Sequence, residues 1–446
     1  MKRVVLVRLA PVLVWMLAIL PFVCIGKIGP SEAWDQDYYH RPVIKILSSQ
    51  LPTPDFSNFG SATTPGYHLF MAVLDRLGAD DLGLRLVSSL FGLAAAVVLA
   101  RVVARLSDSE PLGAVAGIAF LLNPYVLSSA MFLTTDDLAL LMMVLALGSA
   151  IDSAREGSNR HTLIRAMLWS TGAAVVRQVL VWTAGLAWIG ALMRSIVGKE
   201  PRPLRALTLA ALSMVPAVLL VAYFVWVWKG LTPPGFQSVI PIGLNPATPI
   251  YMLALVGCWG ACAAACHPRF LQAVCSRWAV IGAVIVLVGS LSIPTAPDGP
   301  PDGRRWGGVL WSVSAYFPVV LDRSSFIVLL AAGGGAVLGA VLWIARGHAR
   351  RSETWTALSA LVLCTLAQMA NSYCFERYLV PLGIVCMFLA VAPLFTGRSE
   401  ADSRPRLAPA LIAAVVGLAL SVMSVHAKLD DIGPPPPKPD EFRPQL

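Results

Sequence analysis

The chain has 446 residues, of which 57% are hydrophobic and only 13% charged, and it carries a formal net charge of +9. A soluble domain carries about 25% charged residues, so the composition excludes a soluble globular protein and predicts an integral membrane protein. The excess of Lys and Arg is explained by the basic loops that membrane proteins keep in the cytoplasm, so nucleic acid is not expected as a partner.

Apolar runs of roughly 15 to 22 residues recur along the whole chain, which is the length a helix needs to cross a hydrocarbon core. They predict an all-α, polytopic fold with about 11–13 transmembrane helices. No internal repeat is evident. The expected spans are 9–26, 84–104, 112–130, 137–152, 163–177, 178–193, 206–228, 249–266, 278–293, 326–345, 354–372, 378–395 and 407–425.

The distribution of basic residues predicts an N-terminus in the cytoplasm. Lys2 and Arg3 precede the first span, and no clear cleavage site follows it, so an uncleaved signal anchor is expected. The basic loops alternate consistently only if Arg177 marks an outward turn between two short helices. Segments 27–83, 229–248 and 294–325 then lie outside.

The first external loop, residues 27–83, carries an acidic cluster close to the membrane. Asp35 and Asp37 follow the first span, where ionisable groups usually face a cavity and mark a substrate path. Either carboxylate could act as a general base or bind a sugar hydroxyl, and aromatic neighbours suit a sugar ring. The alternative is a solvated helix cap. The neighbouring side chains Trp34, Tyr39 and His40 are candidate sugar or acceptor ligands.

The same loop contains two further helical signals. Apolar residues at helical spacing over 36–50 predict an amphipathic helix on the membrane surface. The stretch Thr63-Thr64-Pro65-Gly66-Tyr67-His68 predicts a turn that opens a short helix leading back to the membrane. Tyr67 and His68 are candidate sugar or acceptor ligands, and helix capping is the alternative for this stretch.

A second acidic pair, Asp136 and Asp137, follows Thr134 and Thr135 at the outward end of a hairpin between spans. Helix capping by Thr or Asp accounts for one acid. Because two adjacent acids exceed what one cap requires, we expect at least one of them to contact the acceptor or the sugar.

Basic residues at the outer ends of later spans could bind an anion. Arg177, followed by Gln178, lies inside an apolar stretch, so its guanidinium needs an anionic partner, which could be a protein carboxylate or a ligand phosphate. Arg377, within Glu376-Arg377-Tyr378, is either a second phosphate donor or an interfacial anchor.

The other segments and the cysteines give no clear indication of a functional site. Residues 1–425 form the expected membrane domain, the breaker-rich segment 294–308 predicts a mobile loop, and the proline-rich tail 426–446 is expected to be disordered. Cys258, Cys262 and Cys266 recur every fourth residue, which favours helix packing over metal binding. No cofactor is predicted, and a divalent metal is neither required nor excluded.

Taken in order, these motifs resemble the GT-C superfamily of membrane glycosyltransferases that use polyprenyl-phosphate sugars. They are most similar to the dolichyl-phosphate-glucose α-1,2-glucosyltransferases. The matching stretches are Asp35 to His40, Thr63 to Tyr67, Thr135-Asp136, Arg177-Gln178 with Trp182, and Arg377-Tyr378. The family usually shows an Asp-Glu pair where this chain has Asp35-Gln36-Asp37, so either acid could take the catalytic place.

The resemblance implies an inverting hexosyltransferase in a bacterial inner membrane, with its active site on the extracytoplasmic side. Its partners would be a polyprenyl-phosphate sugar, a lipid-linked or envelope glycan acceptor, and membrane lipids. Asp35 or Asp37 would be the base, while Arg177, Gln178 and Arg377 would bind the donor phosphate. Alternatives are an oligosaccharide ligase, a protein O-mannosyltransferase-like enzyme of the same fold, or a lipid or sugar transporter. A transporter is disfavoured because transporters often contain internal repeats and bind substrate near the membrane midplane. This chain shows no internal repeat, and its acidic residues are predicted to lie at one edge of the membrane.

Overall fold

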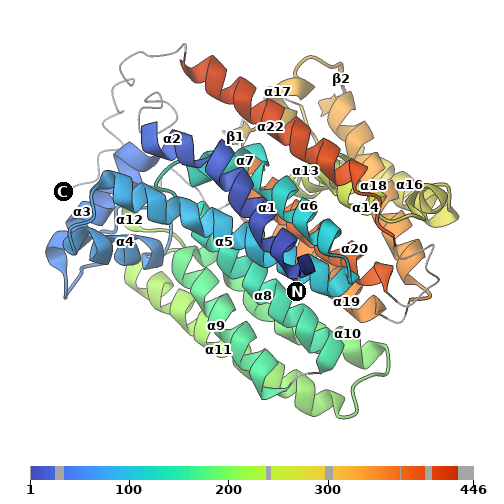
Figure 1. Cartoon of the computed structure of the whole chain (residues 1–446), viewed down its shortest axis with the longest axis horizontal. Coiled ribbons are helices and arrows are strands. Elements are labelled where there is room, and N and C mark those ends of the chain that lie inside the picture. The colour runs from blue at the N-terminus through green and yellow to red at the C-terminus, as the bar shows by residue number, and fades with distance from the viewer. Residues whose placement is uncertain are drawn as a thin grey trace.

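A computed structural model describes most of the chain, and Figure 1 shows it as a bundle of long helices. The residues described are 2–25, 35–157, 159–237, 243–296, 305–348, 350–371, 373–396 and 404–429. Trp34, most of the expected loop 294–308, and the tail beyond residue 429 therefore lie outside the described part of the chain.

The N-terminal half of the bundle follows the expected spans closely. It consists of α1 (Lys2–Ala18), α2 (Leu20–Ile25), α5 (Asp81–Ser107), α6 (Glu110–Leu121), α7 (Pro124–Ala130), α8 (Asp136–Glu156), α9 (Arg160–Val176), the 3₁₀ turn η2 (Gln178–Ala184), α10 (Gly185–Ile196) and α11 (Pro203–Trp228).

The C-terminal half likewise contains a helix in each expected span. Its helices are α13 (Thr248–Leu255), the π-turn η3 (Val256–Gly260), α14 (Ala261–Ala265), α15 (Phe270–Val274), α16 (Arg277–Ser290), α18 (Ser325–Ala345), α19 (Arg351–Met369), α20 (Glu376–Val391), the 3₁₀ turn η4 (Ala392–Phe395) and α22 (Ala408–Leu429). Because α22 continues to Leu429, the first residues of the expected tail are helical.

The helical, polytopic class is confirmed. Among the described residues, seven helices are long and apolar enough to cross a membrane, or eight if the bent pair α6 and α7 forms one span. Shorter apolar helices occur at Leu9–Ala18, Arg277–Ser290 and Ala408–Met423. The expected 11–13 spans exceed this number because several segments are short: α9 has 17 residues, which reach about 26 Å against a core of about 30 Å.

Segment 27–83, which is predicted to be the first external loop, forms short helices where the sequence predicts them. The π-turn η1 (Gln36–His40) leads into α3 (Arg41–Gln50), and α4 (Gly66–Arg76) follows the Thr-Pro-Gly turn. Both helices lie beside α12 (Pro234–Gln237) on the left of Figure 1. Helix α3 buries Val43, Ile44 and Leu47, which confirms an amphipathic helix. The Trp228 indole N–H donates to the Phe56 carbonyl at 2.9 Å and ties this loop to the end of α11.

A second external segment lies against the end of α20. Strand β1 (Arg305–Gly307) pairs in parallel with β4 (Tyr373–Phe375), and the short helix α17 (Val309–Ser314) follows β1. A small hairpin of β2 (Val319–Val320) and β3 (Arg323–Ser324) then leads into α18.

The break between α6 and α7 arises from local sequence. Asn123 precedes Pro124, whose missing N–H is tolerated at the start of a new helix. The Asn123 side chain accepts from the Tyr125 N–H at 3.1 Å and caps α7. The two helices meet at 69°. This bend places the polar side chains of α7 beside the outer ends of α8 and α20.

Candidate active site

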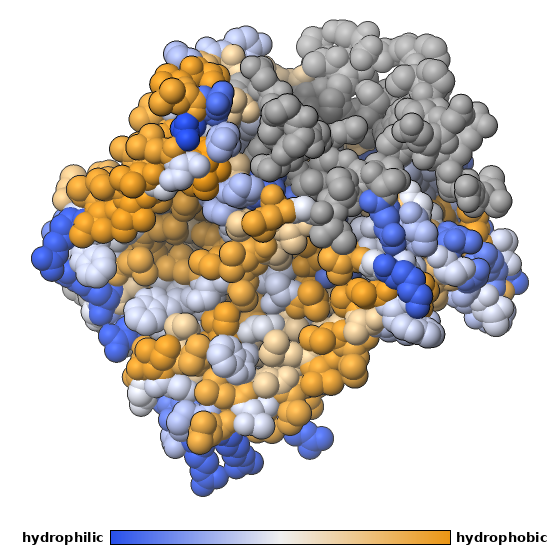
Figure 2. Space-filling model, turned by 180° about the vertical axis from the view of Figure 1, so that it is seen from behind, coloured by the Kyte–Doolittle hydropathy of each residue, from blue (hydrophilic) through white to orange (hydrophobic). Residues whose placement is uncertain are grey.

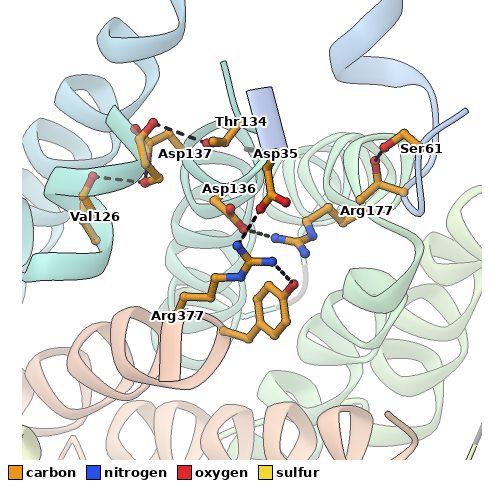
Figure 3. A network of polar contacts seen from close by, with 11 residues as sticks. Asp35, Ser61, Val126, Thr134, Asp136, Asp137, Arg177 and Arg377 are labelled. Atoms are coloured by element: carbon orange, nitrogen blue, oxygen red, sulfur yellow. Dashed lines mark hydrogen bonds and ion pairs between the residues drawn. The ribbon is translucent and has the colours of Figure 1, made fainter. Parts of the chain in front are cut away.

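Two ion pairs meet at the end of the bundle where α8 and α20 begin and α9 ends, as Figure 3 shows. Arg377 Nη1 donates to Asp35 Oδ2 at 2.7 Å, and Arg177 Nη1 donates to Asp136 Oδ1. The four side chains come from four segments distant in the sequence: the first external loop, α8, the end of α9, and α20. The structure therefore brings together four of the charged residues singled out from the sequence.

The Tyr378 ring connects the two pairs. Its hydroxyl oxygen accepts from Arg377 Nη2 at 2.8 Å. The guanidinium carbons of Arg177 and Arg377 lie 4.7 and 4.9 Å from the ring centroid. The negative face of an aromatic ring attracts cations, so Tyr378 and the two carboxylates together allow two like charges to lie close to each other.

Neither the Asp35 nor the Asp136 side chain caps a helix. Asp35 precedes η1 in a helical conformation and makes no capping hydrogen bond. Thr135, which precedes α8, also caps nothing with its side chain, and Asp136 is the first residue of that helix. Helix capping, the alternative considered from the sequence, therefore does not explain Asp35 or Asp136. Both carboxylates form ion pairs with arginines instead.

Arg177 lies at the break between two helices, where the charge pattern predicts a turn. Helix α9 ends at Val176, Arg177 adopts an extended conformation with φ −146° and ψ 116°, and η2 begins at the next residue. Of the two partners left open by the sequence, a protein carboxylate is the one seen, because Arg177 pairs with Asp136.

Two small cavities adjoin the ion pairs. One has a volume of about 100 Å³ and is lined by Asp35, Gln36, Tyr125, Ser128, Ser129, Phe132, Thr134, Asp136, Leu140, Arg377 and Pro381. The other has about 30 Å³ and is lined by Asp136, Ala139, Leu140, Met143, Arg177, Val179, Leu180, Gln368, Arg377, Tyr378 and Leu382. Asp136 and Arg377 border both cavities, so the charged cluster separates them.

The two acids of the first loop have different surroundings. Asp37 is exposed and accepts from its neighbour Gln36 at 3.0 Å. Asp35 faces the cavity, where burial by itself raises its pKa, but the Arg377 guanidinium holds that pKa below the usual aspartate value. Residues two apart on a helix point in roughly opposite directions, and this explains why only Asp35 reaches the arginines.

The two histidines of the loop form a buried pair. His40 Nδ1 and His68 Nε2 lie 2.9 Å apart, and they join η1 to α4. Burial, supported by Arg177 and Arg377 and opposed by Asp35, lowers the pKa of His40 to about 4. Burial also lowers the pKa of His68 well below its usual value, and His40 adds to that effect. Both rings are therefore neutral at pH 7 and hold the loop in place behind Asp35.

Several predicted ligands have other contacts in the structure. Gln178 binds backbone: its amide nitrogen donates to the Ala62 carbonyl at 2.8 Å, and its oxygen accepts from the Thr64 N–H at 3.0 Å. Tyr67 is buried, with its hydroxyl 3.1 Å from that of Ser88. Both residues thus fix the first loop to the bundle, and the phosphate contact of Gln178 and the sugar contact of Tyr67 stay predictions.

Asp137 also departs from the prediction. It is fully buried and accepts from the Ser129 hydroxyl on α7, and a Cβ at Gly92 of α5 would come within 2.5 Å of its Oδ2 atom. Successive helical residues are rotated by about 100°, so Asp137 faces the packed interior while Asp136 faces the cavity. Tyr39, a further predicted sugar ligand, lies against Phe236 of α12 with ring centroids 5.5 Å apart.

Glu376 is a contact centre that the sequence did not indicate. Its carboxylate accepts from Tyr125 and Tyr251 at 2.6 Å each and from the Trp311 N–H at 2.9 Å. The hydroxyl of Tyr125 in turn accepts from the Val309 N–H at 2.9 Å. These bonds hold α17 against α20 directly beside Arg377. The signal in the sequence that could have pointed to this cluster is the presence of polar groups, such as Tyr125, within an apolar span.

The arrangement suits the recognition of an anion beside a carboxylate. Guanidinium groups present planar pairs of donors that match phosphate oxygens, and Asp35 could accept a proton next to such a ligand. Within the described part of the chain, no three His, Cys, Asp or Glu side chains lie close enough together to hold a metal ion.

Comparisons with known proteins add little to this geometry. No protein-family profile and no curated protein sequence matches the chain. Among solved structures, the chain is similar to ArnT from Cupriavidus metallidurans in the apo state, with 15% sequence identity and a TM-score of 0.38. The match covers 95% of this chain and 83% of that one. Because this likeness is loose, the functional argument rests on the site itself.

Proposed function

We propose that the chain is an inverting membrane glycosyltransferase of the GT-C type, which moves a hexose from a polyprenyl-phosphate sugar to a hydroxyl of a lipid-linked or envelope glycan. The observation that carries this proposal is the meeting of the Asp35–Arg377 and Asp136–Arg177 ion pairs beside two small cavities, both of which are bordered by Asp136 and Arg377. Within this class, the motif order favours a relative of the dolichyl-phosphate-glucose glucosyltransferases, so glucose is the first sugar to test.

The two arginines supply the binding site for the donor phosphate. In a polyprenyl-phosphate sugar the phosphate is a diester with one negative charge, and it leaves as a monoester whose charge approaches two. Arg177 and Arg377 therefore interact more strongly with the departing group than with the bound donor. Interactions that strengthen in this way lower the barrier rather than merely tighten binding.

Asp35 supplies the base. The acceptor oxygen attacks the anomeric carbon, the bond from that carbon to the phosphate oxygen breaks with its electron pair going to the phosphate, and the acceptor proton passes to Asp35. Attack from the face opposite the phosphate inverts the anomeric centre. Asp35 is favoured over Asp37 because it borders the cavity, whereas Asp37 is exposed.

Donor binding would itself prepare the base. In the unliganded site Arg377 lowers the pKa of Asp35, which makes its carboxylate a weaker base. A donor phosphate that takes over the Arg377 guanidinium removes this effect and lets the pKa of Asp35 rise. Asp136, bound to Arg177, is then positioned to orient a hydroxyl of the sugar or acceptor.

The site must open to admit the donor. A cavity of about 100 Å³ is smaller than the roughly 300 Å³ or more that small-ligand sites provide. The Asp35–Arg377 pair is the more exposed of the two pairs, with side chains 38% and 43% accessible. We therefore assign this outer pair as the contact that the incoming phosphate breaks.

The proposed setting is the inner membrane of a bacterium, with the N-terminus in the cytoplasm and the site on the extracytoplasmic side. Support comes from the basic residues that gather at the ends of helices opposite the site, as the positive-inside rule requires. Asp136, Arg177 and Arg377 lie at the other ends of α8, α9 and α20.

The deciding experiment incubates the purified, reconstituted protein with a panel of polyprenyl-phosphate sugars and nucleotide sugars and measures release of the lipid phosphate. Release from a polyprenyl-phosphate hexose, with inversion in the product, would support the proposal. Use of a nucleotide sugar alone would overturn it, as would release that is equal in wild type and Asp35→Asn. Asp37→Asn is the matched control, and it should retain the wild-type rate, whereas loss of a general base costs about 10²–10⁴-fold.

A further inference from the structure

A wide groove lies between α9 and α11, at the end of the bundle opposite the candidate active site. Its volume is about 770 Å³. It is lined by Asn159, Arg160, Leu163, Ile164, Met167, Glu200, Pro201, Arg202, Arg205, Ala206, Leu209, Leu212 and Ser213. These residues belong to the first turns of the two helices and to the chain that leads into α11.

The walls of the groove are apolar and open to the surroundings. Ile164 on α9 is 39% exposed, and Leu209 and Leu212 on α11 are 38% and 59% exposed. Figure 2 shows broad hydrophobic surface that ends in hydrophilic residues at the bottom of the molecule, where Figure 1 places the turn between α10 and α11. The walls thus continue the lipid-facing surface into the groove.

The rim of the groove is positively charged. Arg160, Arg202 and Arg205 are all exposed, and none of them pairs with an acid among the residues that the structure describes. The acid at the rim, Glu200, accepts from Arg194 at 3.2 Å and so is already paired. The guanidinium groups of Arg160, Arg202 and Arg205 therefore all lie at the mouth of the groove without an acidic partner among the described residues.

We propose that this groove binds an anionic glycerophospholipid of the cytoplasmic leaflet, with its phosphate at the three arginines and an acyl chain along the walls. Arginine forks match phosphate oxygens, and basic pockets between helices on the cytoplasmic side attract anionic headgroups. The apolar walls distinguish this ligand from a soluble phosphate. The site is independent of the proposed sugar transfer.

The test measures lipid adducts of the full-length, detergent-purified protein by native mass spectrometry, titrating phosphatidylglycerol and, separately, phosphatidylcholine. The variant Arg160→Gln/Arg202→Gln/Arg205→Gln removes the rim charges. Its matched control, Arg101→Gln/Arg277→Gln/Arg404→Gln, removes three exposed arginines that we place on the same side but outside the groove. Thermal unfolding checks that both variants are folded.

The rim variant should bind phosphatidylglycerol on the order of 100-fold more weakly than wild type, while the control triple and all phosphatidylcholine adducts stay unchanged. Equal loss in both triples would show general surface charge and would overturn the proposal, as would undiminished binding to the rim variant.

A second pair of variants tests the walls without changing charge. Leu212→Trp fills the groove and should reduce phosphatidylglycerol binding, whereas Leu219→Trp, at a residue 63% exposed on α11 outside the groove, should not. If soluble glycerol phosphate displaced the lipid at equal concentration, the acyl chain would have no part in binding and the assignment to a lipid would fail.

Discussion

Substitutions of Arg177 and Arg377, the two arginines of the candidate site, should differ in their effects on the free energy of unfolding. The Asp35–Arg377 side chains are 38% and 43% exposed, whereas those of Asp136 and Arg177 are 20% and 15% exposed. We predict that Arg377→Gln reduces kcat with little loss of stability, and that Arg177→Gln reduces both kcat and stability.

The magnitudes follow from this difference in exposure. An exposed ion pair contributes about 0–1 kcal/mol, so Arg377→Gln should lower the free energy of unfolding by less than about 1 kcal/mol. Removing one partner of a fully buried pair costs about 3–5 kcal/mol. Because the inner pair keeps some contact with water, we expect about 2 kcal/mol for Arg177→Gln. Either change removes one stabilising donor for the leaving phosphate, which costs about 10²–10³-fold in kcat.

Both quantities can be measured on the same preparations. Release of polyprenyl phosphate gives kcat, and a thiol-reactive dye reports unfolding through the buried Cys364, Cys374 and Cys386. Arg41→Gln is the matched control, because Arg41 pairs with Asp81 at a comparable exposure of 48% and 41% but lies outside both cavities. An Arg377→Gln protein that transferred sugar as fast as Arg41→Gln, or that was as unstable as Arg177→Gln, would refute the reasoning.

Three further predictions concern pH and metal. Because Arg377 lowers the pKa of Asp35, this carboxylate is ionised at neutral pH, so kcat/KM should stay level from about pH 8 to about pH 5 and fall only below about pH 4; a decline beginning near neutrality would contradict this. The pKa of the neutral His40 is lowered from 6.5 to about 4, so His40 stabilises the fold above pH 6.5, and this contribution is lost as the pH falls toward 4. The unfolding temperature of His40→Gln should therefore depend less on pH between 6.5 and 4 than that of the wild type. Parallel plots of unfolding temperature against pH for the two proteins would show the reasoning to be wrong. Since guanidiniums provide the charge opposite the phosphate, transfer should persist in EDTA, and loss of activity that Mg²⁺ restores would disprove that role.

The helices were largely predictable from the sequence. Long apolar runs have few alternatives in a membrane, where the backbone must bond to itself, and each expected span contains a helix. The interruptions were not predictable in the same way. Hydrophobicity alone describes neither the bend between α6 and α7, which arises at Asn123 and Pro124, nor the π-turn between α13 and α14.

The charged core of the site was also predictable, but its neighbours were not. Unpaired charges are costly near lipid, so Asp35, Asp136, Arg177 and Arg377 had to find partners, and they found one another. Gln178 and Asp137, each adjacent to one of these residues in sequence, point elsewhere. Asp137 diverges from Asp136 by the rotation of about 100° between successive α-helical residues. Gln178 begins η2 directly after the extended Arg177, so the two side chains of that pair also point in different directions.

The bonds around Glu376 have a consequence for how this protein can diversify. The segment beside the site is held through main-chain N–H groups of Val309 and Trp311, so its exposed side chains can vary without loss of the attachment, although the Trp311 ring is itself buried against Tyr251. Gly308 is the exception, because a Cβ there would collide with Glu376. Exposed side chains of this segment, beside Arg377, can therefore change while its attachment to α20 stays intact. Under the proposed function, such changes would alter the choice of acceptor.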